Sequence, residues 1–290
     1  MRCLMGKRKQ RIKLLRSLLF SITTLLFLGL VAWEESSMEG KGVLATLTDH
    51  MASGEDSRAE PLRLQSLLPV SSSADKRKLP IYSVDTEKNQ IAISFDAAWG
   101  AEDFERIMEI LDKHQVKTTF FMTGNWVRDN PECVKQLVEK GHDLGNHSEH
   151  HYDMVKLSKK EMAEELQGVY DQVKELTGYE IDLFRPPYGS YDNTVIEVAE
   201  ENGYYPVQWS VDSLDWKDYG VDSIINTVCQ HKELKPGAII LCHNGAKYTA
   251  DALDQLLTGL ENRGYEIVPI SKLILRENYT MDVTGKQIPN

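Results

Sequence analysis

Cysteine is scarce in this 290-residue chain and does not follow the spacing of structural sites. The four cysteines are at positions 3, 133, 229 and 242, and no Cys-x-x-Cys motif occurs. This irregular spacing argues against a disulfide framework and against a cysteine metal site. We expect at most one bridge, between Cys229 and Cys242, with free thiols as the alternative.

The chain also lacks a glycine-rich phosphate loop after its first predicted strand, which argues against a nucleotide-binding sheet. After Trp33 there are 26 basic and 44 acidic residues, so this part carries a net charge of −18. Such a field repels polyanions, and we therefore expect no nucleic-acid partner. The charge is compatible with a neutral or cationic glycan, and equally with simple solubility.

Acidic residues are missing altogether from positions 1–33, where residues 1–16 carry seven basic side chains and residues 17–33 are uncharged and apolar. A basic flank followed by an apolar run is typical of an export or anchoring signal. Residues 30–32 match a cleavage site poorly, so an uncleaved anchor is favoured over a cleaved signal peptide. We expect a single-pass protein of the cell membrane, with residues 1–16 cytoplasmic, 17–33 transmembrane and the rest extracytoplasmic.

Two flanking segments look weakly structured. Residues 34–88 are rich in Ser, Glu, Asp and Lys, contain three prolines, and are expected to form an extracytoplasmic stem, mostly a disordered spacer. Residues 277–290 are polar and are expected to fray.

Between them, residues 89–276 alternate strand and helix signals and form the expected folded domain. Strands are predicted at 91–95, 116–122, 142–145, 181–184, 204–209, 238–242 and 265–269. Helices are predicted at 102–114, 131–140, 158–177, 192–202, 221–231 and 249–263, the third opening with a capping box at Ser158 and Glu161. About seven βα units imply a parallel sheet with the functional site at the carboxyl ends of its strands. The pattern allows a closed or distorted barrel and an open doubly wound sheet.

Polar residues gather at these strand ends. His147 and His151 are four residues apart. On a helical turn their side chains would share one face and could bind one metal ion. Surface histidines are the commoner explanation of such a pair. Asp96, Arg185 and His243 also follow predicted strands, which is the distribution required of an active site on one rim. Two further acids at a strand end are Asp212 and Asp215.

In order and spacing these motifs resemble the NodB-type polysaccharide deacetylases, carbohydrate esterase family four. The matching elements are Ser-Phe-Asp ending at 96, His-Ser-x-x-His at 147–151, Arg-Pro-Pro-Tyr-Gly from 185, Asp-x-x-Asp-Trp from 212 and Leu-x-His ending at 243. The resemblance covers the whole predicted domain. It implies a distorted (β/α)7 barrel that removes N-acetyl groups from amino-sugar glycans, with a divalent metal such as zinc, cobalt or manganese. The Ala-Ala-Trp-Gly after Asp96 resembles a sporulation-associated branch, which implies peptidoglycan of the spore or cell wall as substrate.

The resemblance also assigns roles that amide hydrolysis requires. Asp96 would be the general base, Arg185 would hold it in place, and His243 would be the general acid. Asp215, with Asp212 as the alternative, would orient His243.

The remaining assignments concern the metal and the substrate. His147 and His151 would bind the metal, which lowers the pKa of bound water and polarises the carbonyl. The Tyr188 backbone N–H would point at the oxyanion. Apolar walls for the sugar ring would come from Trp216, Trp126 and the Tyr188 ring. For each tryptophan, the alternative is packing in the hydrophobic core.

One position departs from the family pattern, because the second of two adjacent aspartates, a metal ligand, is replaced by Ala97. A catalytic zinc site usually has three protein ligands, and Glu149, His150 or Asp153 would have to compensate. The favoured interpretation is a membrane-anchored N-deacetylase. The alternatives are a catalytically impaired, glycan-binding wall protein on the same fold and an esterase that removes O-acetyl groups.

Overall fold

The computed structural model describes residues 77–290. The predicted segments 1–16 and 17–33 and most of the predicted stem lie outside the described residues. Within residues 77–290, none of the helices combines the length and apolar character needed to cross a bilayer. This finding contradicts the predicted single-pass membrane localisation for the described residues, and the predicted membrane partner has no support there.

The centre of the domain is a parallel sheet in the strand order β6-β5-β4-β3-β2-β8-β7, with β9 also paired to β2. The sheet curls, and among the described residues β6 and β7 at its two ends do not pair, so it forms a distorted, incompletely closed barrel. The predicted distorted (β/α)7 barrel is confirmed over the open sheet. The strands are β2 (Gln90–Ala97), β3 (Thr119–Met122), β4 (Asp143–Asn146), β5 (Leu183–Phe184), β6 (Tyr205–Pro206), β7 (Val211–Asp212), β8 (Ile239–His243) and β9 (Glu266–Ile267).

Both faces of the sheet are covered, as its continuous apolar strands require. Along β2, Ile91, Ile93 and Phe95 belong to the larger core that packs against the helices, whereas Ala92 belongs to a second core with Phe121. This alternation is the two-residue period of a strand. Ala97 continues the helix-facing series and is fully buried.

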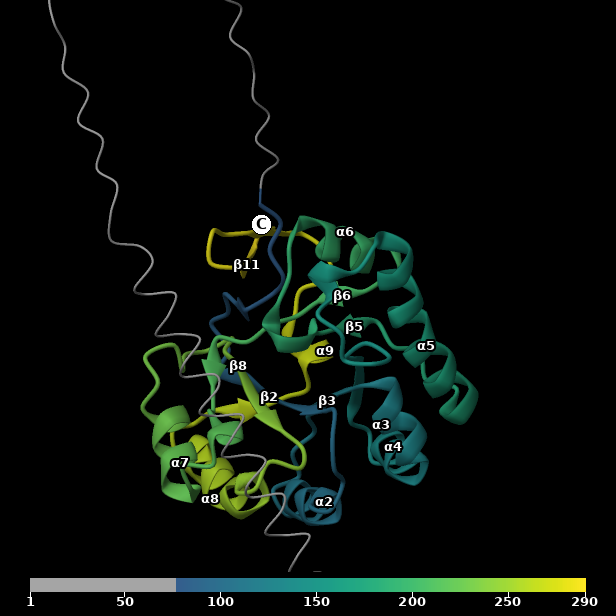
Figure 1. Cartoon of the computed structure of the whole chain (residues 1–290). Helices are drawn as coiled ribbons and strands as arrows, with labels where there is room; N and C mark the ends of the chain where they lie inside the picture. The colour runs from purple at the N-terminus through teal and green to yellow at the C-terminus, as the bar shows by residue number, and fades with distance from the viewer. Residues whose placement is uncertain (1–76) are drawn as a thin grey trace, which may run out of the picture. The chain divides into compact units, whose positions relative to one another are not determined.

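Helices surround the sheet, with α7 and α8 adjacent to each other and α2 beside α8 (Figure 1). The helix α5 opens with the predicted capping box, since Ser158 and Glu161 bond each other's backbone, and it ends at Gly178 with a φ of +74°. The helices are α2 (Phe104–Lys113), α3 (Gly124–Asp129), α4 (Pro131–Glu139), α5 (Lys159–Thr177), α6 (Asn193–Glu201), α7 (Val221–Cys229), α8 (Thr249–Glu261) and α9 (Ile270–Leu273).

A second, three-stranded sheet corrects the expectations for both flanks. It contains β1 (Ser83–Val84), β10 (Tyr279–Met281) and β11 (Lys286–Pro289), in the order β1-β11-β10. Residues 277–290 are thus not a frayed tail, and Val84 of the expected stem is buried in the core. The physical reason is Gln287, whose fully buried amide bonds the backbone N–H and carbonyl of Leu275 at 2.8 and 2.7 Å.

The three cysteines within residues 77–290 are not paired. Cys133, Cys229 and Cys242 are free thiols, so the expected bridge between Cys229 and Cys242 is wrong. Cys242 lies inside the strand β8, whereas Cys229 ends the helix α7.

Candidate active site

The carboxyl ends of β2, β4, β5 and β8 meet at one rim of the barrel, and most of the predicted site residues meet with them. Asp96 and His243 are direct neighbours in the β2–β8 pairing. A pocket of about 410 Å³ opens at this rim. It is lined by Asp96, Trp99, His147, His151, Tyr188, Gly189, Trp209, Asp212, Trp216, Leu241 and His243.

Asp96 lines this pocket and forms a buried ion pair with Arg185. Arg185 Nη1 donates to Asp96 Oδ1 at 2.6 Å, and its Nη2 donates to the Gln208 carbonyl at 3.2 Å. The guanidinium is fully buried and lies 4.1 Å from the centroid of the Phe121 ring. Burial alone would raise the pKa of Asp96, but the Arg185 charge, with smaller contributions from two histidines, lowers that pKa below its ordinary value. The carboxylate is therefore ionised and can accept a proton.

His243 has the opposite environment. Its Nδ1 bonds Asp215 Oδ1 at 2.7 Å, and its backbone N–H donates to Asp215 Oδ2 at 2.7 Å. The Thr249 hydroxyl donates a third hydrogen bond, of 2.7 Å, to this fully buried carboxylate. Burial would lower the pKa of His243, but the hydrogen bond and charge of Asp215 raise it above its ordinary value. Asp212 instead accepts from the Leu214 N–H at 2.8 Å, so the structure favours Asp215 as the partner of His243.

The histidine pair is brought together by a loop and not by the helical turn that its spacing suggested. Ser148 and His151 have left-handed backbones, with φ of +65° and +58°, and the His147 and His151 ring centroids lie 4.9 Å apart. His147 Nδ1 lies 2.7 Å from the Arg185 carbonyl, which can only accept, so this nitrogen carries the hydrogen. The Nε2 lone pair then faces Asp96 Oδ2 at 3.5 Å. Burial lowers the pKa of His147 to about 4 and keeps the ring neutral.

Neutral histidine rings can bind a cation, but two of them alone do not complete a metal site. A bond of the kind that His147 Nδ1 makes to a backbone carbonyl is usual for a metal-ligating histidine, because it fixes the tautomer that leaves Nε2 free to bind a cation. Among residues 77–290, however, no group of three His, Cys, Asp or Glu side chains could hold a metal ion. Ala97 supplies no ligand and lies in the apolar core.

The three side chains proposed to compensate are engaged elsewhere. Glu149 bonds Arg128 at 2.8 Å and Gln172 at 2.7 Å. His150 Nδ1 bonds Glu165 at 2.7 Å, and Asp153 pairs with Lys156 at 3.1 Å. The donor set therefore has two ligands from this chain, one fewer than a usual catalytic zinc site.

Tyr188 forms one wall of the pocket. It lies in the short 3₁₀ turn Pro187–Gly189 with a φ of +61°, a strained value for a bulky residue. Its ring meets the His151 ring edge to face at 4.6 Å and is otherwise largely exposed. This strained turn sets the direction of the Tyr188 backbone at the mouth of the pocket.

Of the two tryptophans predicted to contact the sugar, Trp216 lines the pocket and Trp126 does not. Trp216 lines the pocket and is half exposed. Trp126 does not line it, because the side chain is 2% exposed and its indole N–H donates to the Gly100 carbonyl at 2.7 Å. Trp99 and Trp209 also line the pocket and were not predicted as site residues, although Trp99 stands in the Ala-Ala-Trp-Gly stretch that begins at the last residue of β2.

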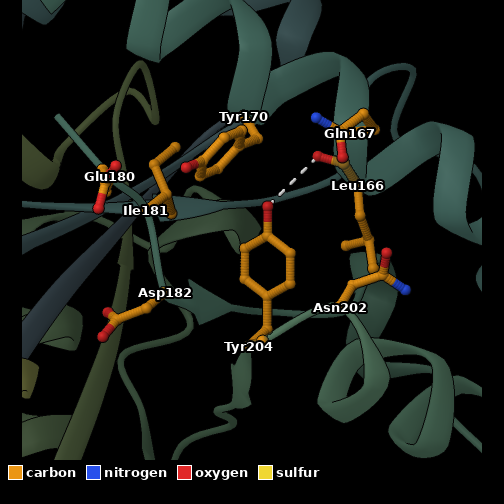
Figure 2. Close-up of a pocket in the computed structure, with 9 residues that line it drawn as sticks. Leu166, Gln167, Tyr170, Glu180, Ile181, Asp182, Asn202 and Tyr204 are labelled. Atoms are coloured by element: carbon orange, nitrogen blue, oxygen red, sulfur yellow. Dashed lines mark hydrogen bonds between the residues drawn. The ribbon is translucent and has the colours of Figure 1, made fainter. Parts of the chain in front are cut away.

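A separate crevice of about 360 Å³ lies between α5 and the β5–β6 region and contains none of the predicted site residues (Figure 2). Its carboxylates are already paired, Glu180 with Lys174 and Asp182 with Arg276. In Figure 2 the Tyr204 hydroxyl points at the Leu166 carbonyl, 3.4 Å away, and it also accepts from Asn146. These two bonds connect Tyr204 to Leu166 of α5 and to Asn146, the last residue of β4, which directly precedes His147.

Comparison with known proteins agrees with this geometry. The family model described as Polysaccharide deacetylase matches residues 83–207. The chain is 33% identical over 204 residues to peptidoglycan-N-acetylmuramic acid deacetylase PdaA of Bacillus subtilis (strain 168), covering 68% of this chain and 75% of PdaA. It is 37% identical over 195 residues to YlxY of the same strain, covering 67% of this chain but only 60% of YlxY.

Solved structures give the same family. The Bc1960 peptidoglycan N-acetylglucosamine deacetylase has a TM-score of 0.64 at 31% identity, covering 67% of this chain and 92% of that chain. BA3943 from Bacillus anthracis, described as a CE4 family pseudoenzyme, has a TM-score of 0.64 at 35% identity, covering 67% of this chain and 68% of that chain. The chain belongs to the polysaccharide deacetylases of carbohydrate esterase family four, a family of hydrolases whose members are generally metal-dependent.

Proposed function

We propose that this protein hydrolyses the N-acetyl groups of amino-sugar glycans, with peptidoglycan as the substrate class. The observation that carries the proposal is the pairing of Asp96 and His243 in one pocket, where the pKa of the acid is lowered and that of the histidine is raised. Two titratable groups whose environments push their pKa values apart in this way suit a base and an acid at neutral pH. The peptidoglycan deacetylases among the relatives support the substrate class.

The chain's own residues account for each proton. Asp96, held by Arg185, accepts a proton from a water whose oxygen attacks the acetamide carbonyl carbon. The Tyr188 N–H donates to the developing oxyanion, a contribution on the order of 10²–10³ in rate. His243, oriented by Asp215, gives a proton to the amine nitrogen as the C–N bond breaks. The products are acetate and a free amino sugar.

A divalent cation, zinc, cobalt or manganese, would be held by His147 and His151. When bound, it would polarise the carbonyl and lower the pKa of a bound water. Because Ala97 offers no third ligand, we expect weaker retention of the cation than in a three-ligand site.

A second function is a glycan-binding wall protein without turnover on the same fold. It is favoured by the two-ligand donor set and by the likeness to a structure described as a pseudoenzyme. A mutant of that neighbour is described as having restored enzymatic activity, which indicates that substitutions can return turnover to this fold.

Acetate release by the full chain separates the two functions. The substrates are peptidoglycan and N-acetylglucosamine oligomers, with O-acetylated xylan to detect esterase activity, each with added zinc, cobalt or manganese and with a chelator. Chelator-sensitive acetate release from the N-acetylated glycans is the expected result. Saturable glycan binding without acetate at any metal concentration would overturn the deacetylase and support the wall-binding function.

A further inference from the structure

Trp99 stacks on the ring of His243 at the rim of the pocket. The two ring centroids lie 5.7 Å apart, and their planes differ by 23°. Trp99 is 47% exposed, so its indole contacts the imidazole while part of it remains open to the pocket. A cation within about 6 Å of an aromatic centroid is attracted to the ring face.

We propose that Trp99 is a positioning residue for the general acid: its indole holds the His243 ring in place and stabilises the protonated imidazolium through a cation–π interaction. This inference rests on the proposed function for its catalytic meaning. The contact itself is a property of the folded chain and can be tested without turnover.

The backbone around Trp99 is fixed on the strand that carries His243. The Gly100 carbonyl accepts from Trp126 Nε1 at 2.7 Å and from Asn244 Nδ2 at 2.9 Å, and both donors are buried. The Asn244 backbone N–H in turn donates to the Asp96 carbonyl at 3.0 Å. Two elements therefore hold the Trp99 loop at one point.

The backbone at Gly245 also lies close to the backbone of Trp99. Gly245 has a φ of +84°, and a Cβ at this position would lie 2.7 Å from the Trp99 carbonyl oxygen. Any larger residue would displace the loop from the segment that follows His243. The chain thus packs the Trp99 backbone directly against the backbone that carries the acid.

The charged and titratable groups facing His243 determine how the contact can be measured. They are Asp215 and Asp212 from the β7 end, Asp96 from β2 and His151 from the loop after β4. Trp99 adds two opposing effects to this set. Its ring face stabilises the charged imidazolium, whereas its bulk excludes water and destabilises that form. A substitution to alanine would remove both effects, so the test needs side chains that keep the apolar cover.

The experiment compares the full chain with Trp99→Phe and Trp99→Leu by NMR titration of the histidine ring protons. The His243 resonance is identified by its loss in His243→Gln. Leucine keeps an apolar cover but has no ring face, and phenylalanine has a weaker one than indole. We expect the pKa of His243 to fall in the order Trp, Phe, Leu, by about 0.4–1.5 pH units between Trp and Leu.

Trp216→Leu is the matched control, because this indole lines the same pocket without a ring contact to His243, and it should leave the His243 pKa unchanged. An unchanged or higher pKa in Trp99→Leu would overturn the proposal and leave Trp99 as an apolar cover. If the protein releases acetate, the alkaline limb of kcat/KM should move down with the His243 pKa. If it releases none while the titration follows the expected order, the deacetylase function fails and the Trp99 contact stands.

Discussion

At the scale of single residues, Asp96 combines catalysis and stability in one side chain. We predict that Asp96→Asn abolishes acetate release and also lowers the free energy of unfolding by about 3–5 kcal/mol, because it leaves the fully buried Arg185 charge without its partner. Acetate assays and urea denaturation measure the two effects. The exposed Asp129→Asn variant should change neither, and a fully stable Asp96→Asn would contradict the structural part of the prediction.

Ala97 stands where the family pattern has a second, metal-ligating aspartate, so a substitution at this position tests metal binding. To reach His147 and His151, a carboxylate introduced at Ala97 has to turn out of the apolar core past the end of β2. We predict that Ala97→Asp binds zinc or cobalt at least about 10-fold more tightly, a gain of about 1.4 kcal/mol. Calorimetric titration of the metal measures this change.

The same substitution should lower stability without metal, since Ala97 is fully buried among apolar side chains, and added metal should restore it by binding only the folded state. Ala97→Ser serves as the control, as it adds no charge. A stability loss without any gain in metal affinity would mean that the carboxylate stays in the apolar layer and that Ala97 does not limit metal binding.

The residue roles differ in how far the sequence could predict them. Asp96, Arg185 and His243 follow strands of a parallel sheet, and this position alone brings them to one rim. The tryptophans could not be assigned in this way, because Trp99 and Trp126 both follow strand ends and only side-chain packing decides which of them is exposed. Exposure depends on contacts such as the Trp126 bond to Gly100, which come from a distant part of the chain.

At the scale of elements, the loop between β4 and α5 replaces the helical turn expected from the spacing of His147 and His151. Left-handed residues and tertiary bonds bring the two rings together, and neither follows from a four-residue spacing. Glu165, buried on α5, is the main anchor of the loop. It accepts from the His150 backbone N–H at 2.8 Å and bonds His150 Nδ1 at 2.7 Å, while its own carbonyl accepts from the Glu149 N–H.

We predict that Glu165→Ala loosens this loop, because it removes both bonds of the carboxylate to His150. The free energy of unfolding should fall by about 2–3 kcal/mol, and the His150 amide should exchange with solvent faster. Hydrogen exchange and urea denaturation measure these effects. Its neighbour Glu164 is exposed and, within residues 77–290, has one ion pair, with Lys160, so Glu164→Ala should leave both quantities unchanged. Equal effects of the two variants would refute the anchoring role of Glu165.

At the scale of the whole molecule, the barrel could be predicted from the sequence and the separate three-stranded sheet could not. The alternation of strand and helix patterns along the chain predicts a parallel sheet, because each strand and each helix has a recognisable local periodicity. The pairing of β1 with β11 joins residues about 200 positions apart in a polar context, and its stability depends on the buried amide of Gln287. Local patterns carry no information on such a distant pairing, so both flanks were taken for unstructured segments.

The stability of the whole domain should depend on pH through His142, a buried histidine outside the active site. It is 2% exposed, its Nδ1 accepts from the Thr118 N–H at 3.1 Å, and its Nε2 has no partner within the described residues. Burial, followed by the nearby Lys117 charge, lowers the pKa of His142 to about 4 from an unfolded value of 6.5. Between these values the unfolded chain binds more protons than the folded one, so stability is fully present above pH 6.5 and falls as the pH drops toward 4.

We predict that His142 accounts for about 2–3 kcal/mol of the stability lost between pH 7.5 and pH 4.5. Urea denaturation at the two pH values measures the loss. His142→Asn keeps an acceptor for Thr118 and removes the titrating ring, so this variant should lose less stability on acidification than the parent. His147, whose pKa is also lowered to about 4, contributes a further part of the loss that His142→Asn leaves intact. If His142→Asn leaves the pH difference at its original size, the buried His142 ring is not a source of the acid sensitivity.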